Sequence, residues 1–417
     1  MNEFNMAQAA SAAKQASRVI AQADSQVKSA LLTAIAQNIE DNTEAILAAN
    51  SQDIAHGQEK GLAPAMLDRL LLTPERVRDI ADAIREINAL PDPVGSSDKT
   101  EVRPNGIQVS KMRIPLGVVA MIYEARPNVT AEAAALCIKS GNGVILRGGS
   151  EAIHSNLALA KCLHQALEKA DFPADIVTVI PDTSRKMIET LLTQRQFIDL
   201  VIPRGGEGLI NMVTEKSQIP VIQHFKGVCH LYIDKYADLE KALAILVNGK
   251  VQRPSACNAI ETLLVHQDIA KTFLPKAAES LAQFNVKVHA CEQSVGYFNQ
   301  AELATDDDYH AEYLGYEVAV KVVESFDQSI AHINTYTSDH TEVIISQDIS
   351  RAQKFVRAIN SSVVMINASS RFSDGGQLGL GAEIGISTSK LHAYGPMGLE
   401  ALTTQKFVVI GDGQIRD

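Results

Sequence analysis

The chain has 417 residues, of which 46% are hydrophobic and 21% charged, and its formal net charge is −11 at pH 7. This length exceeds one ordinary domain, so we expect two or three domains with sizeable cores. The negative charge argues against a general affinity for nucleic acid or for anionic membrane surfaces. The apolar runs are too short to span a bilayer, and the first residues lack the blocks of a signal peptide. We therefore expect a cytoplasmic protein.

The first 115 residues change from a helical pattern to a strand pattern. Apolar residues recur at three- and four-residue spacing over 6–90, for example at Leu31, Leu32, Ile35 and Ile39, which predicts amphipathic helices. Residues 100–115 then alternate around a Pro104-Asn-Gly turn signal, which predicts an exposed hairpin. Such a hairpin could pair subunits or pack on its own domain.

From residue 117 the pattern becomes strand, loop and helix in repetition. Strands are predicted at 118–123, 144–147, 176–180, 197–202 and 220–224, and helices at 131–139, 153–169, 184–193 and 208–215. A second block of the same kind runs from about 228 to 385. This alternation is typical of a parallel sheet covered by helices on both faces, so the fold class is α/β with two doubly wound domains.

Three loops of the first block follow predicted strands and carry polar residues and glycines. They are Tyr123-Glu-Ala-Arg-Pro-Asn-Val-Thr130, Arg147-Gly-Gly-Ser150 and Pro203-Arg-Gly-Gly-Glu-Gly208. Ligands of doubly wound sheets bind beyond the carboxyl ends of the strands. Glycines permit close backbone approach, and a helix N-terminus favours pyrophosphate. The third loop matches neither G-x-G-x-x-G nor a P-loop, so a plain strand-to-helix turn stays open as an alternative.

Cys257 is the candidate nucleophile. A helical pattern over 239–251 precedes it and a strand pattern over 259–265 follows it, so the thiol lies at a junction among small and polar neighbours. Arg253 and local backbone N–H groups could stabilise a thiolate there. The alternative is a small apolar side chain that fills a gap. The other four cysteines form no C-x-x-C pair, so the sequence predicts neither a metal site nor a disulfide framework.

Several motifs together give the chain a resemblance to the aldehyde dehydrogenase superfamily, and within it to the γ-glutamyl phosphate reductase family. The motifs are Tyr123-Glu-Ala-Arg-Pro-Asn-Val-Thr130, Ile202-Pro-Arg-Gly-Gly206, Gln252-Arg-Pro-Ser-Ala-Cys257, Ala331-His-Ile333 with His340, Asn367-Ala-Ser-Ser-Arg-Phe372, Asp374-Gly-Gly-Gln-Leu-Gly-Leu-Gly-Ala-Glu383 and Gly395-Pro-Met-Gly-Leu-Glu-Ala-Leu-Thr-Thr404. The resemblance covers essentially the whole chain.

The resemblance implies a division into domains and a reaction. An NADP-binding domain would comprise 1–99 and 117–226, a catalytic domain 227–385, and an oligomerisation flap 100–116 and 405–417, while 386–404 returns to the cofactor domain. The reaction implied is the NADPH-dependent reduction of L-glutamate 5-phosphate to L-glutamate 5-semialdehyde with release of phosphate, which is the second step of proline biosynthesis from glutamate. The family further implies a homo-oligomer. Transient contact with glutamate 5-kinase, which makes the substrate, is compatible with the resemblance.

The resemblance also assigns residues. Cys257 matches the nucleophile that forms a thioester, and Asn128 the asparagine that helps to bind the oxyanion. Cofactor contacts are expected at Arg147, Ser150, Gly205, Gly206 and Glu312. Substrate contacts are expected at Arg126 and Arg371, whose guanidinium groups suit anions, and at Asn367. For either arginine, an ordinary ion pair is the alternative.

One departure from the superfamily concerns His224. Hydrolytic aldehyde dehydrogenases have a glutamate there, which would activate water against the thioester. Its absence favours an acyl-phosphate reductase over an aldehyde-oxidising enzyme. A non-catalytic nucleotide-binding scaffold is the rival from another class. The neutral Ser150 beside Arg147 favours NADPH, because NAD-dependent relatives usually have a carboxylate at that position, and Glu151 would restore one if the alignment were shifted by one residue.

Overall fold

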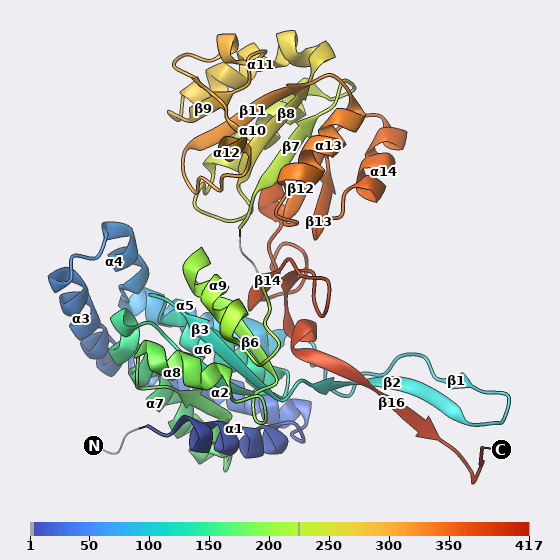
Figure 1. Cartoon of the computed structure of the whole chain (residues 1–417). Helices are drawn as coiled ribbons and strands as arrows, with labels where there is room; N and C mark the ends of the chain where they lie inside the picture. The colour runs from blue at the N-terminus through green and yellow to red at the C-terminus, as the bar shows by residue number, and fades with distance from the viewer. Residues whose placement is uncertain (1–3, 224–225, 417) are drawn as a thin grey trace. The chain divides into compact units, whose positions relative to one another are not determined.

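The structure is a computed structural model that describes residues 4–223 and 226–416. The chain forms two compact units. Unit 1 comprises Met1–Gln223, Leu380–Ile386 and Met397–Asp417, and unit 2 comprises His224–Gly379 and Ser387–Pro396. The predicted α/β class is confirmed, because each unit contains a parallel sheet covered by helices (Figure 1).

Five helices open unit 1, as the spacing of apolar residues predicts. They are α1 (Met6–Ile20), α2 (Ser25–Asp41), α3 (Thr43–Glu59), α4 (Pro64–Leu70) and α5 (Pro74–Ala89). The side chains of Asn5, Asp24 and Thr73 cap α1, α2 and α5 by accepting hydrogen bonds from first-turn N–H groups. Pro74 stands at the first helical position of α5, where its missing N–H has no consequence.

The sheet of unit 1 has the strand order β5-β4-β3-β6 and is parallel throughout. Its strands are β3 (Val118–Tyr123), β4 (Gly143–Arg147), β5 (Val177–Val179) and β6 (Leu200–Arg204). Helices α1, α8 (Arg185–Leu192) and α9 (Glu207–Lys216) pack on one face, and α2, α5, α6 (Asn128–Lys139) and α7 (Ile153–Lys169) lie on the other. Strand β3 is therefore buried on both faces, which explains its unbroken apolar run.

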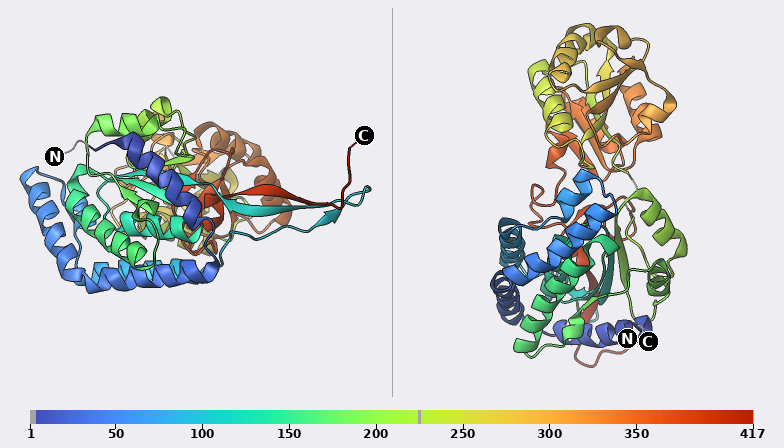
Figure 2. Two further views of the ribbon diagram at one scale, coloured as in Figure 1. Left: turned by 90° about the horizontal axis from the view of Figure 1, so that it is seen from below. Right: turned by 90° about the vertical axis from the view of Figure 1, so that its left-hand side faces the viewer.

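An antiparallel ribbon belongs to unit 1. Strands β1 (Glu101–Val102) and β2 (Gln108–Pro115) form the predicted hairpin, and Gly106 has the positive φ of +89° that its turn requires. Strand β16 (Thr403–Ile410) pairs with β2 along its whole length. Figure 1 and Figure 2 show this ribbon extending from the rest of unit 1. Exposed apolar side chains on β16 include Phe407, Val409 and Ile410.

The sheet of unit 2 has seven parallel strands in the order β10-β9-β11-β8-β7-β12-β13. They are β7 (Cys229–Ile233), β8 (Ile260–His266), β9 (Lys287–Ala290), β10 (Glu302–Leu303), β11 (Glu317–Val323), β12 (Thr341–Ile345) and β13 (Val363–Ile366). One face packs against α10 (Leu239–Val251) and α11 (Gln267–Ala282). The other packs against α13 (Phe326–Tyr336) and α14 (Ile349–Ala358). Short elements complete the chain, namely α12 (Asp306–Tyr309), β14 (Gly385–Ser387) and β15 (Gly395–Met397).

One predicted strand of unit 1 is wrong. Residues 220–223 form only an isolated bridge between Val221 and Val201, and 224 lies outside the described residues. The bridge is held by the Val201 N–H bound to the Pro220 carbonyl and the Ile222 N–H bound to the Val201 carbonyl. Pro220 has no N–H with which to extend a ladder, so the apolar spacing misled the prediction.

Candidate active site

The predicted site residues of unit 1 lie in loops at one edge of its sheet. The loop with Arg126 and Asn128 follows β3, the loop with Arg147 and Ser150 follows β4, and the loop with Gly205 and Gly206 follows β6. Because these strands are parallel neighbours, their carboxyl ends share one edge. Helices α6 and α9 leave β3 and β6 toward opposite faces of the sheet. The position between these strand ends is therefore where a doubly wound sheet binds its ligand.

Asn128 is the first residue of α6, and a carboxylate orients its side chain. The Asn128 Nδ2 group donates a hydrogen bond to Glu132 Oε1 at 3.0 Å, one helical turn further on. Burial raises the pKa of Glu132, against the opposing effects of the Asn128 hydrogen bond and the nearby charges of Arg204 and Arg126. The hydrogen bond fixes which side of the amide carries nitrogen, so the second Asn128 N–H can point toward a ligand.

The loop before Asn128 is strained and is held by a second carboxylate. Ala125 has a positive φ of +24°, which residues with a Cβ rarely adopt. Its backbone N–H donates to Glu151 Oε1 at 2.6 Å. The exposed Arg126 is the next residue in the loop. Glu151 therefore joins the Arg147 loop to the loop that carries Arg126 and Asn128.

Arg147 lies deeper than its predicted role suggests. Its residue is only 8% exposed, and its Nη2 group donates to the Thr183 carbonyl. The Nε group is buried and has no hydrogen-bond partner among the described residues. Burial lowers the pKa of Arg147, although the carboxylates of Glu151 and Asp182 oppose this effect. Ser150 is exposed at the end of the same loop and begins the short helical turn that leads into α7.

Gly205 and Gly206 form the entry to α9. Gly206 is the N-cap residue of this ten-residue helix, and no side chain of the helix caps it. A Cβ atom on Gly205 would lie 2.7 Å from Leu209 Cδ2, so a larger residue at this position would displace the Leu209 side chain. A Cβ on Gly206 would meet nothing within 4 Å, which leaves open space beside the first N–H groups of α9.

In unit 2, Cys257 lies in the turn between α10 and β8, as predicted. The Ala256 N–H binds the Arg253 carbonyl at 3.1 Å and the Ala259 N–H binds the Ala256 carbonyl at 2.9 Å, so two successive turns surround the cysteine. Cys257 is partly exposed, whereas Cys137, Cys162 and Cys229 are buried. Burial raises the pKa of Cys137 and Cys229 well above the ordinary thiol value. Those buried thiols are therefore poor nucleophiles.

The peptide of Cys257 rests on the segment that leads into β7. A Cβ atom on Gly227 would lie 2.0 Å from the Cys257 carbonyl oxygen and 2.9 Å from its Cα. The Cys229 thiol lies 3.3 Å from the same oxygen and can donate to it. The Cys257 carbonyl therefore lies between Gly227, which has no side chain to obstruct it, and the buried Cys229 thiol.

Arg371 is brought to the Cys257 turn. Its Nε group donates to Gln252 Oε1 at 2.9 Å, and its Nη1 group is buried without a hydrogen-bond partner among the described residues. Burial lowers the pKa of Arg371, and the neighbouring charge of Arg253 lowers it further. A buried guanidinium N–H without an acceptor is uncommon and is the kind of group that an anionic ligand satisfies.

Glu312 lies in the loop before β11, at the same edge of the sheet as Cys257. The loop is braced by the ring of Tyr313, which stacks on His289 with centroids 5.2 Å apart. The His289 ring also contacts carboxylates on both sides of the loop, with Nδ1 3.0 Å from Asp308 and Nε2 3.0 Å from Glu317. The backbone that carries Glu312 is therefore well fixed.

Asn367 is not brought to this edge. It follows β13, and its side-chain amide bonds to both backbone groups of Ser346 at the carboxyl end of β12. Cys257, Arg371 and Glu312 lie at the amino ends of the strands instead. Because the Asn367 amide already has its partners and lies at the opposite edge, we leave it out of the proposed substrate site.

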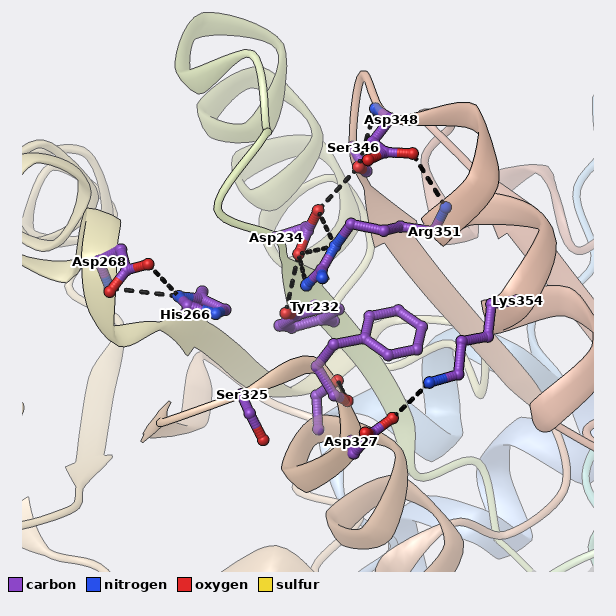
Figure 3. A network of polar contacts seen from close by, with 12 residues as sticks. Tyr232, Asp234, His266, Asp268, Ser325, Asp327, Ser346, Asp348, Arg351 and Lys354 are labelled. Atoms are coloured by element: carbon purple, nitrogen blue, oxygen red, sulfur yellow. Dashed lines mark hydrogen bonds and ion pairs between the residues drawn. The ribbon is translucent and has the colours of Figure 1, made fainter.

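An ion pair between Arg351 and Asp234 lies at the carboxyl edge of the sheet of unit 2. Arg351 Nε lies 2.9 Å and 2.8 Å from the two carboxylate oxygens of Asp234, which also accepts hydrogen bonds from Tyr232 and Ser346 (Figure 3). Burial alone would raise the pKa of Asp234, but the hydrogen bonds from Arg351 and Ser346 outweigh it and hold the pKa below its ordinary value. The helices that follow β7 and β12 lie on opposite faces, so this pair lies at the position where a doubly wound sheet would bind a ligand.

Histidines near the Cys257 turn have structural surroundings. His332 is buried, and loss of hydration lowers the pKa of its ring to about 2, so it is neutral at pH 7. His340 Nδ1 lies 2.7 Å from Thr341 Oγ1. His224, where the hydrolytic base is missing from the sequence, lies outside the described residues.

Metal-binding clusters and membrane-spanning helices are both absent from the part of the chain that the structure describes. Residues 4–223 and 226–416 contain no group of three or more His, Cys, Asp or Glu side chains placed to hold a metal ion. None of the helices in those ranges combines the length and apolar character that a membrane crossing requires.

Sequence reasoning missed the residues that position the site. These are Glu132 behind Asn128, Glu151 on the Ala125 N–H, and Gly227 and Cys229 around the Cys257 carbonyl. The four-residue spacing of Asn128 and Glu132 would have been a signal had the helix been predicted to begin at Asn128 instead of residue 131. The other contacts join segments far apart in the sequence, and no local pattern marks them.

Comparison with known proteins identifies the family. The chain matches the aldehyde dehydrogenase family over residues 1–297. It is 72% identical over 417 residues to γ-glutamyl phosphate reductase of Colwellia psychrerythraea strain 34H, which covers 100% of both chains. The crystal structure of γ-glutamyl phosphate reductase from Thermotoga maritima is 40% identical, has a TM-score of 0.98, and covers 99% of this chain and 100% of that one.

More distant structures share only the fold. An acetylating aldehyde dehydrogenase from Geobacillus thermoglucosidasius is 15% identical, with a TM-score of 0.70 over 99% of this chain and 97% of that one. Its similarity supports the aldehyde-dehydrogenase-like architecture of both units. The chain therefore belongs to the aldehyde dehydrogenase family of oxidoreductases, and within it to the γ-glutamyl phosphate reductase family.

Proposed function

We propose that the protein reduces L-glutamate 5-phosphate to L-glutamate 5-semialdehyde with NADPH, releasing phosphate, as the second step of proline biosynthesis from glutamate. The observation that carries this proposal is the partly exposed Cys257 beside a buried Arg371 N–H that has no partner among the described residues. A nucleophilic thiol next to an anion-binding group suits an acyl substrate that carries negative charge. The names of the close relatives support the choice of substrate.

The first proposed step is acyl transfer to sulfur. The Cys257 thiolate attacks the γ-carbonyl carbon, a carbon–sulfur bond forms, and the carbon–oxygen bond to phosphate breaks. The oxyanion formed on the way accepts a hydrogen bond from the Cys257 backbone N–H, and the amide of Asn128 is the proposed second donor. The fixed Cys257 peptide matters here, because an oxyanion donor stabilises charge only when it is already in place.

The second step converts the thioester to the aldehyde. When bound, the reduced nicotinamide supplies the hydride for this step. The resulting hemithioacetal expels the Cys257 thiolate, which is thereby regenerated. The absence of a glutamate at position 224 supports this route, because water then lacks a general base and the thioester survives until it is reduced.

The residues present fit a dinucleotide in unit 1. The glycines at 205 and 206 leave the N-terminus of α9 accessible to pyrophosphate. Within the part of the chain that the structure describes, the buried Nε group of Arg147 has no partner, and the neutral Ser150 places no carboxylate against a 2′-phosphate. We propose that these residues and Glu312 hold NADPH, with Arg147 and Ser150 favouring it over NADH.

Substrate recognition is proposed for two arginines. Arg371 offers its unpartnered Nη1 group, and Arg126 is exposed in the loop that also carries Asn128. Either could bind the α-carboxylate or the phosphate, since a guanidinium fork matches both. We also propose that the ribbon of β2 and β16 pairs subunits of a homo-oligomer, since an edge strand with exposed apolar side chains is a natural pairing surface.

The proposal is tested by the reverse reaction, which avoids the labile acyl phosphate. Reduction of NADP⁺ by glutamate semialdehyde should require inorganic phosphate. Cys257→Ala should abolish turnover while the dissociation constant of NADPH stays unchanged, and Cys162→Ala is the matched control with a buried thiol. NADP⁺ reduction that proceeds equally well without phosphate would instead identify an aldehyde-oxidising enzyme, and activity in Cys257→Ala would exclude this nucleophile.

A further inference from the structure

A carboxylate from another loop caps the helix at the proposed pyrophosphate site. Glu124, the first residue after β3, places Oε2 3.3 Å from the backbone N–H of Gly206. Gly206 is the N-cap residue of α9, and the helix has no side-chain cap of its own. The contact joins the segments that follow the carboxyl ends of β3 and β6, which is where the ligand of a doubly wound sheet binds.

The shape of the glycine loop accommodates this carboxylate. A Cβ atom on Gly205 would lie 2.8 Å from Glu124 Cδ and 2.9 Å from Glu124 Oε2. The carboxylate therefore lies directly against the Gly205 backbone, in space that any larger residue would fill. The Glu124 residue itself is exposed, so its side chain can rotate into solvent without disturbing a packed core.

Two anions cannot share the same backbone N–H. The N-terminus of a helix attracts negative charge through its free N–H groups and its dipole, and it attracts a carboxylate for the same reasons as a pyrophosphate. When the pyrophosphate is absent, the Glu124 carboxylate binds the N–H group, and when the pyrophosphate is bound, the carboxylate is displaced. Like charges within a few ångströms also repel.

We propose that Glu124 is a displaceable cap that competes with the cofactor's pyrophosphate for the Gly206 N–H and so weakens cofactor binding. This inference rests on the proposed dinucleotide site in unit 1. The carboxylate protects the helix N-terminus while the site is empty and returns as the oxidised cofactor departs. Its effect is therefore to favour release, at a cost in affinity. Substitution of most residues that line a site weakens binding, whereas substitution of Glu124 is expected to strengthen the binding of NADPH.

The test measures cofactor affinity by isothermal titration calorimetry and release by stopped-flow NADPH fluorescence. Glu124→Gln removes the charge but keeps the length of the side chain. We expect it to bind NADPH about fivefold more tightly, which corresponds to roughly 1 kcal/mol for an exposed charge interaction, with a slower release rate. Glu215→Gln removes the same charge from the last turn of α9, away from the site, and should bind like the unmodified protein.

A ligand without pyrophosphate provides the second control. Adenosine 2′-monophosphate should bind the unmodified protein and Glu124→Gln equally well, because it has no pyrophosphate to compete with Glu124 for the Gly206 N–H. Unchanged or weaker NADPH binding in Glu124→Gln would overturn the proposal, and so would equal tightening for both ligands, which would indicate a general electrostatic effect. If the unmodified protein binds no NADPH, the proposed function itself fails, and this result is distinct from the others.

Discussion

Replacement of Gly227 by alanine should damage catalysis through the backbone of Cys257. The new Cβ would lie 2.0 Å from the Cys257 carbonyl oxygen, whereas real Cβ contacts essentially never fall below 3.0 Å. The two segments must therefore separate by about 1 Å, and a displacement of that size at a reacting group can lower the rate about 10²-fold. Gly227 does not have a positive φ, so alanine meets no backbone strain and the loss would come from the contact alone.

The assay combines turnover with the reactivity of the thiol. We expect kcat to fall about 10²-fold in the reverse reaction. We also expect slower labelling of Cys257 by iodoacetamide, located by peptide mass spectrometry because Cys291 is also partly exposed. Gly296→Ala is the matched control, since its Cβ meets nothing within 4 Å. A Gly227→Ala protein with unchanged melting temperature, kcat and labelling rate would refute the reasoning.

Three further changes test other contacts. Glu151→Ala should lower kcat about tenfold, because the backbone N–H of the strained Ala125 loses a charged hydrogen-bond acceptor. Glu151→Gln keeps an acceptor and should retain most of the activity. An equal loss of kcat in both variants would show that the charge of Glu151 matters and not its hydrogen bond. Asp234→Ala should lower the unfolding free energy by about 3 kcal/mol in urea titrations, since Arg351 loses its partner. Because the folded pKa of Asp234 is depressed, this stabilisation is complete above the ordinary aspartate pKa and is lost as pH falls through the folded value; an equal difference at pH 7 and at pH 2 would contradict it. Ser150→Glu should shift kcat/KM from NADPH toward NADH, and no shift would show that this loop does not face the 2′-phosphate.

The sequence predicts regular elements well where local signals agree. Helix α10 has the predicted bounds, because Asp238 caps its first turn and its apolar residues recur at helical spacing. Strand β8 begins and ends one residue later than predicted. The prediction was this close because a run of β-branched and leucine residues between turns is typical of a buried strand. The position of Cys257 in a turn between these two elements was therefore predicted as well.

Contacts between distant segments could not be predicted. The family motif containing Asn367 and Arg371 suggested that both reach the substrate, yet the chain reverses at Asn367, which has a positive φ of +52°, and only Arg371 reaches the Cys257 turn. The burial of Arg147 likewise depends on the Thr183 carbonyl, which belongs to the segment after β5. Local sequence does not specify which edge of a sheet a side chain reaches when the chain turns back.

The division of unit 1 along the chain has a consequence for the order of folding. Strand β16 lies C-terminal to all of unit 2, yet it completes the ribbon with β2, and the Leu402 carbonyl accepts a buried hydrogen bond from Asn142 Nδ2. A growing chain therefore exposes β2 with an open edge until the ribosome has translated the whole of unit 2. Most multidomain proteins complete their N-terminal domain first. Here unit 2 can become compact before the final strand of unit 1 has been synthesised. During that interval the unpaired edge of β2 is exposed to pairing with other strand edges.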